Sequence, residues 1–431
     1  MPKFVLIGAG SAQFSTRFVA DILAYPELDG STIVLVDPNA DRLSTLQSFC
    51  LNLVRERGSS VSIEAHADRT GVLDGAHYVL TTIHVGSDDA WQTDIDIARD
   101  YGVDQSVGDT IGPGGVFRGL RNAPVLLDLV HEMELQCPNA VLLQYTNPMS
   151  IICLAISRQS SIVNLGLCHS VQNTARQLAG YLGMELDELD YWTAGINHMA
   201  WVLKLQRRGV DLYPRLREAA ADPDTHALDP VRFDIMRWFG YFVTESSKHM
   251  SEYVPFFRKD AERVQREEFY PFPGDEIRAR SRQVFERLDE HARGETPFEV
   301  SRSHEFAMQI VNSLEGRGSC RINANVPNHG LIANLPDGCC VEVPCQVDSL
   351  GVHPHRIGRL PDQLAALNRT NVNVHEMAVN GLLSGSRDPI YQALMLDPLT
   401  AAVVDPDDIV AMADQLFEAH RGRIPPAFYP S

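Results

Sequence analysis

The chain lacks any run of about 18 apolar residues, so its 431 residues predict no helix that crosses a bilayer. It is poor in basic residues, with 37 Lys and Arg against 56 Asp and Glu, and a net charge of −19 argues against nucleic acid or an anionic membrane as a partner. Its eight cysteines include no Cys-x-x-Cys pair, and no repeat or Pro/Ser-rich linker separates its segments. A disulfide framework is therefore not expected.

The composition is that of an ordinary globular protein, with 44% hydrophobic and 22% charged residues. The chain is too long for one small core and suits two closely packed domains, which we place at residues 1–190 and 191–431. The N-terminus leads directly into an apolar run without the features of a signal peptide, so a cytoplasmic location is expected.

The most specific local pattern lies at the N-terminus. An apolar run at 4–7 ends in Gly8-Ala9-Gly10-Ser11, and a second apolar run at 32–36 ends in Asp37. This order of strand, glycine turn, helix, strand and carboxylate is typical of a dinucleotide site. The third glycine position of the pattern is occupied by Gln13, so the glycine motif is incomplete.

Each residue of this pattern has an expected task. Gly8 allows a tight turn, Gly10 lets the backbone approach a pyrophosphate, and Ser11 opens a helix whose free N–H groups attract that anion. Asp37 can accept hydrogen bonds from both ribose hydroxyls, and its charge would repel a 2′-phosphate. NAD is therefore favoured over NADP.

Apolar runs alternate with helical patterns over residues 1–150, which predicts a parallel, doubly wound sheet with right-handed crossovers. The second half is richer in helical patterns and contains a strand-rich part at 319–347, so we expect an α+β domain packed on a Rossmann-like one. The expected strands are Val61–Ala65, Tyr78–Ile83 and Ala140–Tyr145, and the expected helices are Ala12–Leu23, Ala40–Arg57, Arg118–Gln136, Pro230–Val243 and Ile277–Ala292.

Polar residues mark the ends of these strands, where ligands of such sheets bind. They include His84, Asn147 and the pair Cys168-His169. The loop at 108–115 is rich in glycine and carries Asp109. It suits a ligand-covering loop or simply a long connection, and its composition does not decide between them.

Two further groups of residues carry possible chemistry. Cys168 and His198 can share a divalent metal, although their spacing alone favours a buried thiol and a core histidine. The segment 244–253 gathers His249 and Tyr253 among carboxylates and aromatic residues, which is typical either of an active site or of a solvated helix.

Many ordered motifs nevertheless resemble glycoside hydrolase family 4, the NAD- and metal-dependent glycosidases, and within it the α-galactosidase (melibiase) branch. The resemblance covers nearly the whole chain. It rests on GAGS at 8–11, DTIGPGG at 109–115, YTNPM at 145–149, GLCHSVQ at 166–172, AGINHMA at 194–200, YFVTESSKHMSEY at 241–253, GLI at 330–332 with NLP at 334–336, GCCVEV at 338–343 and TNVNV at 370–374.

The resemblance implies that Cys168 and His198 bind the metal, typically Mn²⁺, and that Asp109 and Asn147 contact substrate or cofactor, with Asp109 also a candidate catalytic residue. It also implies substrate contacts for Asn197 and His249. The sequence Cys168-His169-Ser170 resembles the branch that takes unphosphorylated α-galactosides.

The catalytic roles are likewise implied by the family. Tyr253 is the candidate base, with Tyr241 or a metal-bound hydroxide as alternatives. His169 protonates or orients the leaving oxygen, or only contacts a sugar hydroxyl. The sequence departs from close relatives at His304, where they often carry Arg, which places the contacts around that position in doubt.

The family's activity is hydrolysis through transient oxidation. NAD⁺ takes hydride from C3 of the sugar, a base removes the C2 proton, the glycosidic bond breaks by elimination, water adds, and the hydride returns. The expected substrates are terminal α-galactosides such as melibiose, with α-glucosides or α-uronides as alternatives. A plain NAD-dependent dehydrogenase of the lactate/malate dehydrogenase-like architecture and a non-catalytic NAD sensor are the rival classes. Relatives are usually homodimers or homotetramers.

Overall fold

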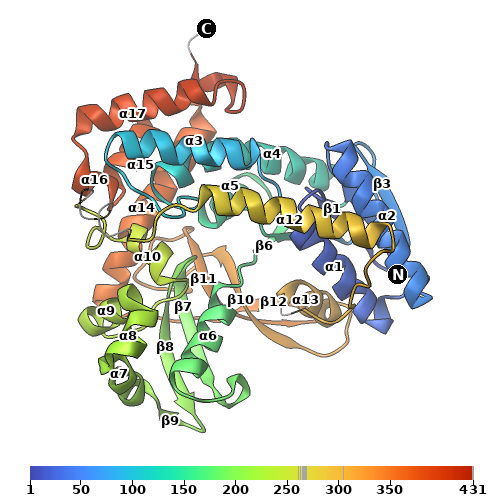
Figure 1. Ribbon diagram of the computed structural model, residues 1–431, viewed down its shortest axis with the longest axis horizontal. Helices are drawn as coiled ribbons and strands as arrows, with labels where there is room; N and C mark the ends of the chain where they lie inside the picture. The colour runs from blue at the N-terminus through green and yellow to red at the C-terminus, as the bar shows by residue number, and fades with distance from the viewer. Residues whose placement is uncertain (261, 263, 265–268, 304, 430–431) are drawn as a thin grey trace.

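The computed structural model describes residues 1–260, 262, 264, 269–303 and 305–429, with the backbone alone at 12 and 13. His304 lies outside the described residues. One mixed sheet of twelve strands runs through the molecule, and helices cover its faces (Figure 1).

The first six strands of this sheet are parallel. Their order is β3-β2-β1-β4-β5-β6, which reverses direction between β1 and β4. Ligands of such sheets bind beyond the carboxyl ends of the strands near this reversal. The predicted doubly wound sheet is thereby confirmed. The strands are β1 (Lys3–Ile7), β2 (Thr32–Val36), β3 (Ser62–His66), β4 (Tyr78–Thr81), β5 (Val141–Gln144) and β6 (Val163–Gly166).

Strand β1 shows why the sheet is held from both sides. Phe4 and Leu6 belong to one buried apolar cluster, and Val5 and Ile7 belong to another. Successive side chains of a strand point to opposite faces, so a strand buried on both faces reads as a continuous apolar run. The run therefore fixes β1 in the centre of the sheet.

Antiparallel strands continue the sheet beyond β6. A single residue pair, Asn325 with Gly166, joins β10 to β6, and another, Glu342 with Gly195, joins β11 to β7. Strands of the second half thus extend the sheet of the first, and a boundary at residue 190 stays a prediction. These strands are β7 (Asp190–Ile196), β8 (Met199–Arg207), β9 (Val210–Asp211), β10 (Cys320–Pro327), β11 (Cys340–Asp348) and β12 (Gly351–Pro354).

Two of the early helices lie where the sequence predicts them, and α4 does not. The predicted start of α4 at Arg118 is wrong, because the helix begins at Gly112. Pro113 fits the first turn, and Gly114 and Gly115 have no side chain to strike the preceding loop: a Cβ at Gly115 would lie 2.3 Å from the carbonyl carbon of Thr110. Half of the predicted glycine loop is therefore the first turn of a helix.

The helices of the first half are α1 (Ala12–Ala24), α2 (Ala40–Arg57), α3 (Ser87–Asp100), α4 (Gly112–Gln136), α5 (Met149–Gln159) and α6 (Ser170–Tyr181). Those of the second half are α7 (Tyr213–Ala221), α8 (Pro223–Leu228), α9 (Pro230–Phe239), α10 (Ser247–Tyr253), α12 (Gly274–Ala292), α13 (Phe306–Leu314), α14 (Asp362–Ser384), α15 (Asp388–Leu396), α16 (Thr400–Val403) and α17 (Pro406–Ala419). Among the described residues, none of these helices has the length and apolar character needed to cross a membrane.

Candidate active site

The glycine turn after β1 forms a cradle that side chains would fill. Gly8 has φ +82°, and a Cβ there would lie 2.8 Å from the carbonyl oxygen of Thr82. A Cβ at Gly10 would lie 2.6 Å from Asp37 Oδ2, which instead accepts a hydrogen bond of 2.8 Å from the Gly10 N–H. Both glycines are required by close backbone approach. The turn and the carboxylate fit the pyrophosphate and ribose of a dinucleotide.

A cleft of 1590 Å³ opens from this turn. Gly8, Gly10, Ser11 and Asp37 line it together with His169, which follows β6. Helix α12 closes the cleft from the outside and crosses in front of β1 and α1 (Figure 1). Four predicted dinucleotide residues and one predicted catalytic residue therefore share one cavity, and Asn147, also predicted to contact the cofactor, is not among the residues that line it.

The structure brings Cys168 and His198 together from separate elements. Cys168 follows β6, and His198 occupies the two-residue turn between β7 and β8 with a positive φ of +62°. Such turns require positive φ, so His198 is held in a conformation that is unusual for its residue type. Its Nε2 lies 3.4 Å from Cys168 Sγ.

This spacing fits a shared metal ion. A cation about 2.1 Å from a histidine nitrogen and about 2.3 Å from a thiolate separates the two atoms by about 3.1 to 3.6 Å for angles between 90° and tetrahedral. Burial alone would raise the pKa of Cys168, but the neighbouring His198 and the hydrogen bonds of Ser170 lower it overall. The donor set therefore favours the thiolate, which is the form that binds metals.

Thr110, in the loop before α4, is the centre of a buried hydrogen-bond network. Its Oγ1 lies 2.7 Å from the Tyr253 hydroxyl and 2.8 Å from His249 Nε2, both on α10. The same oxygen lies 3.5 Å from His198 Nδ1, the ring nitrogen that faces away from Cys168. Thr110 thus links three of the predicted site residues, and a hydrogen bond to Nδ1 would orient the imidazole for a metal at Nε2.

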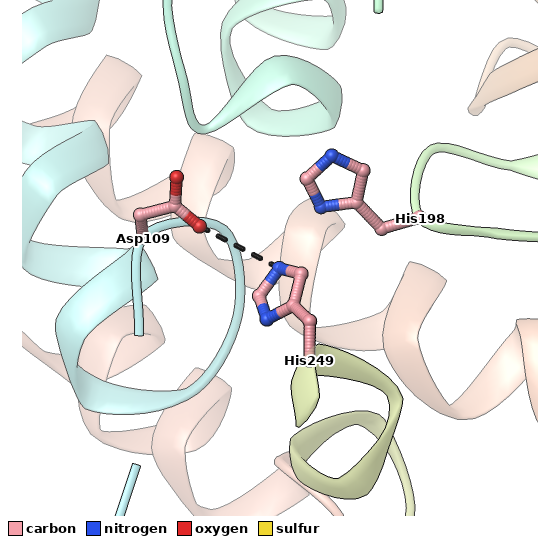
Figure 2. Close-up of side chains that lie close together, drawn as sticks. All are labelled: Asp109, His198 and His249. Carbon is pink, nitrogen blue, oxygen red and sulfur yellow. Dashed lines mark ion pairs between the residues drawn. The ribbon is translucent and has the colours of Figure 1, made fainter. Parts of the chain in front are cut away.

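Asp109 lies beside this network. Its Oδ2 accepts a hydrogen bond of 2.9 Å from Asn147 Nδ2, and its Oδ1 lies 3.5 Å from His249 Nε2. Figure 2 shows Asp109 on its loop, His198 at the hairpin turn and His249 on α10 converging from three directions. One ligand atom from each of these residues lies within 4.8 Å of the others, so the trio is a second arrangement able to hold a cation.

Glu252 anchors the loop that carries Asp109 and Thr110. This fully buried carboxylate accepts hydrogen bonds from the backbone N–H groups of Ser106, Val107 and Gly108, and it lies 3.2 Å from His249 Nδ1. Burial alone would raise its pKa, but the bonds and charge of His249 outweigh burial and lower the pKa to about 2.

The other predicted residues occupy distinct positions. His169 is half-exposed in the cleft, with Nδ1 4.0 Å from Glu305 Oε1. Asn197 is buried in the hairpin turn beside the Glu342 carboxyl, and neither side chain reaches a partner with hydrogen-bond geometry among the described residues. Burial, reinforced by the Cys168 charge, raises the pKa of Glu342. Tyr241, the alternative to Tyr253 as the base, packs its ring against Tyr213.

Several site residues escape prediction from the sequence. Thr110 and Glu252 lie in segments that the sequence marks, but nothing local distinguishes them as the centre and anchor of a network. Arg118 and Glu342 lie on a helix and a strand with apolar neighbours, and only the tertiary structure brings them beside Asp109 and Cys168 respectively. A charged residue inside an apolar run is the one signal that could have revealed both.

Residues 3–184 match the family model described as "Family 4 glycosyl hydrolase", and residues 193–400 match that of the "Family 4 glycosyl hydrolase C-terminal domain". The chain belongs to the family 4 glycosyl hydrolases. A curated relative of this hydrolase is the α-galactosidase of Bacillus subtilis, 39% identical over 437 residues that cover 99% of each chain. The predicted family and enzyme class are confirmed.

Solved structures support the fold of the hydrolase. A 6-phospho-α-glucosidase from gut microorganisms, solved in complex with NAD and Mn²⁺, matches with a TM-score of 0.85 and 22% identity over 98% of this chain and 99% of the other. Malate dehydrogenase from Plasmodium falciparum matches with a TM-score of 0.52 and 12% identity over 89% and 99% of the chains. The second likeness confirms the predicted dehydrogenase-like architecture, at the level of fold alone.

Proposed function

We propose that this family 4 hydrolase cleaves terminal, unphosphorylated α-galactosides with NAD and a divalent cation, preferably Mn²⁺. The observation that carries the proposal is the approach of Cys168 Sγ to His198 Nε2 within 3.4 Å, beside His169, which lines the cleft that begins at the Gly8–Gly10 turn. A relative named α-galactosidase at 39% identity supports the choice of sugar. The alternatives within the same site are α-glucosides and α-uronides.

Bound NAD would supply a reversible hydride acceptor, and the cation would supply a Lewis acid that stabilises negative charge on the sugar oxygens. Gly10 and Asp37 hold the dinucleotide at the switch point of the sheet. Cys168 and His198 hold the cation. This pair is preferred over the Asp109, His198 and His249 trio because Thr110 already engages His198 Nδ1 and His249 Nε2.

Proton transfer is assigned to Tyr253 and His169. Burial raises the pKa of Tyr253, so its role as the base at C2 requires a neighbouring positive charge that lowers the pKa of the phenol. The bond from Tyr253 to Thr110 fixes the hydroxyl in place. His169, half-exposed in the cleft, is positioned to protonate the leaving oxygen, and Asp109, Asn147, Asn197 and His249 contact the sugar.

Three finer properties belong to the same proposal. The thiolate requirement at Cys168 suits a reducing compartment, and all eight cysteines are free, so we assign the enzyme to the cytoplasm. The sequence Cys168-His169-Ser170 supports an unphosphorylated substrate. The working assembly is proposed to be a homodimer or homotetramer.

Turnover of p-nitrophenyl α-galactoside, α-glucoside and α-glucuronide with NAD⁺, Mn²⁺ and a thiol reductant tests the proposal. We expect cleavage of the galactoside without net NADH and, in D₂O, deuterium at C2 of the product. NADH that accumulates with substrate would identify a plain dehydrogenase, and cleavage of none of the three would refute the substrate class.

The metal assignment has its own test. Cys168→Ser is expected to lose Mn²⁺ binding and activity while retaining NAD binding, measured by metal analysis and by fluorescence titration. Cys320→Ser, a half-buried cysteine at the start of β10, is the matched control and should behave as the wild type. A Cys168→Ser variant with unchanged metal affinity would contradict the assignment.

A further inference from the structure

Three polar side chains between the cleft and the Thr110 network carry buried atoms without a hydrogen-bond partner among the described residues. They are Arg118 Nε and Nη1 on α4, His84 Nε2 after β4, and Asp109 Oδ1 in the loop before α4. Buried polar groups in folded proteins are normally hydrogen-bonded, and a group left without a partner calls for a ligand, a water or a strained role. Such atoms on three separate elements in one region favour a ligand.

Arg118 is the most costly of the three to leave without a partner. The residue is 9% exposed, and it forms no ion pair within the part of the chain that the structure describes. Its guanidinium lies over the ring of Trp91, 5.2 Å from the ring centroid, and the Trp91 Nε1–H donates to the Val107 carbonyl at 2.7 Å. The guanidinium therefore lies over the aromatic ring, and its Nε and Nη1 groups are left to donate.

The charge of Arg118 interacts with the Asp109 carboxylate, although no carboxylate of the described residues forms an ion pair with the guanidinium. Burial lowers the pKa of Arg118 from its ordinary value, and the nearby Asp109 opposes that effect. Burial also lowers the pKa of His84, with Arg118 adding to the shift, so His84 is a neutral imidazole. The three side chains thus present a cationic donor, a neutral ring nitrogen and an anionic acceptor.

The chemistry of this set selects its ligand. Arg118 only donates hydrogen bonds, while Asp109 Oδ1, already beside His249, only accepts them. A hydroxyl group does both, so vicinal hydroxyls satisfy Arg118 and Asp109 at once. A ligand carboxylate would be repelled by Asp109, and an ammonium group would be repelled by Arg118. Neutral polyols such as hexopyranoses are the class that fits.

We propose that Arg118 is a sugar-binding residue, which donates from Nε and Nη1 to hydroxyl oxygens of the terminal sugar while a neighbouring hydroxyl donates to Asp109. The proposal rests on the proposed function and extends it, because it assigns recognition of the uncharged ring to a residue outside the metal site. His84 and Trp91 line the dinucleotide cleft, so Arg118 stands where sugar and dinucleotide meet.

Arg118→Gln and Arg118→Lys test the proposal in the enzyme loaded with NAD⁺ and Mn²⁺. Arg118→Gln is expected to raise the KM for p-nitrophenyl α-galactoside about tenfold to a hundredfold, the usual effect of losing hydrogen bonds to a charged group. Arg118→Lys keeps the charge but loses the planar guanidinium, so its KM should lie between that of the wild type and that of Arg118→Gln. Arg57→Gln, an exposed arginine at the end of α2, is the matched control.

Binding measurements separate this role from others. Calorimetry with D-galactose, D-glucose and D-glucuronate should show Arg118→Gln weakened about tenfold for the sugar that the wild type binds, with the Kd for NAD within about twofold. A KM within about threefold of the wild type, or a Kd for NAD that weakens in parallel, would overturn the assignment. So would a fall in kcat and thermal stability without a change in sugar affinity, because that pattern indicates a structural arginine.

The result also distinguishes the two proposals. A wild type that cleaves no galactoside refutes the proposed function, and the three sugars in the calorimeter still decide the role of Arg118. A wild type that cleaves the galactoside while Arg118→Gln matches it refutes only the sugar-binding role.

Discussion

Two arginines one turn apart on α4 are both buried, and they have opposite surroundings. Arg121 donates from Nη1 and Nη2 to the two oxygens of Asp94 on α3, and His420, after α17, lies 2.7 Å from Asp94 Oδ1. Arg121 leaves only Nε without a hydrogen-bond partner, whereas Arg118 leaves both Nε and Nη1 without one, and its guanidinium lies over Trp91.

The difference separates structural from functional charge. Removing a charge from water raises the free energy of the folded state, and a charged partner within the protein offsets this desolvation penalty. The ion pair with Asp94 offsets the desolvation of Arg121, so Arg121 stabilises the contacts between α3, α4 and the C-terminal segment. Asp109 offsets only part of the cost of burying Arg118, and Nε and Nη1 have no hydrogen-bond partner among the described residues, so a ligand is expected to supply the remaining interactions. Substitutions at Asp94 and Arg118 test the two arginines directly, and substitutions at Glu252 and Thr110 extend the comparison to other buried polar groups of the site.

Breaking the Arg121 ion pair is expected to have the largest effect. Asp94→Asn leaves the guanidinium buried with a neutral partner and should lower the free energy of unfolding by about 3 to 5 kcal/mol, measured by urea denaturation. Asp96→Asn is the control, because Asp96 is exposed and pairs with Arg99 at 3.7 Å, an interaction worth about 0.5 kcal/mol. A loss of less than 1 kcal/mol in Asp94→Asn would show that α4 does not depend on the pair.

Glu252 is a second buried charge with partners inside the protein, namely three backbone N–H groups and His249, and it lies at the candidate active site. Its pKa is about 2 in the folded state against an ordinary 4.5, so its contribution to stability is complete above pH 4.5 and is lost as the pH falls towards 2. Glu252→Gln should cost about 3 kcal/mol at pH 7, and this difference from the wild type should shrink below pH 4.5 in denaturation curves. A difference that is independent of pH would contradict the low pKa.

Substitutions of Thr110 test whether its hydrogen-bond network with Tyr253 and His249 also contributes to catalysis. Thr110→Val removes the hydroxyl that engages Tyr253 and His249, and it should lower kcat about tenfold by freeing the candidate base. Thr110→Ser keeps the hydroxyl and is the matched control in the same steady-state assay. Equal kcat values for the two variants would show that the network does not orient Tyr253.

The smallest expected effect on stability is at Arg118. Arg118→Met removes a buried charge without a partner while conserving much of the side-chain volume, so the unfolding free energy should stay unchanged or rise by about 1 kcal/mol. Thermal and urea denaturation measure it. Destabilisation on the scale expected for Asp94→Asn would make Arg118 a structural residue like Arg121.

The sequence pattern predicts some elements better than others. Helix α2 occupies the predicted residues 40–57, because the Asn39 side chain caps its start and Gly58 ends it in the left-handed region. The predicted start of α4 is wrong because Gly114 and Gly115 are typical of loops, whereas in the structure they form the first turn of a helix that packs tightly against the backbone of Gly108 and Thr110 just before it.

The site follows the same division. Gly8, Gly10 and Asp37 are predictable because the strand, turn and carboxylate act within one βαβ unit. The structure shows that a Cβ added at Gly8 or at Gly10 would clash with its neighbours. The roles of Cys168, His198, Tyr253 and the other site residues stay predictions. Their proximity is a fact of the tertiary structure.

The parallel sheet, the nucleotide turn and the family can be predicted from the amino-acid order, because short-range periodicity and ordered motifs carry that information along the chain. Which buried charges have partners is set by the folded arrangement of the helices and strands. Arg118 and Arg121 belong to the same helix, and both contact α3, but Arg121 meets the Asp94 carboxylate there, which His420 also contacts, whereas Arg118 meets the ring of Trp91, which lines the cleft. The electrostatic energy of a charge depends on the groups around it in space, and the residues next to it in the sequence do not reveal those groups.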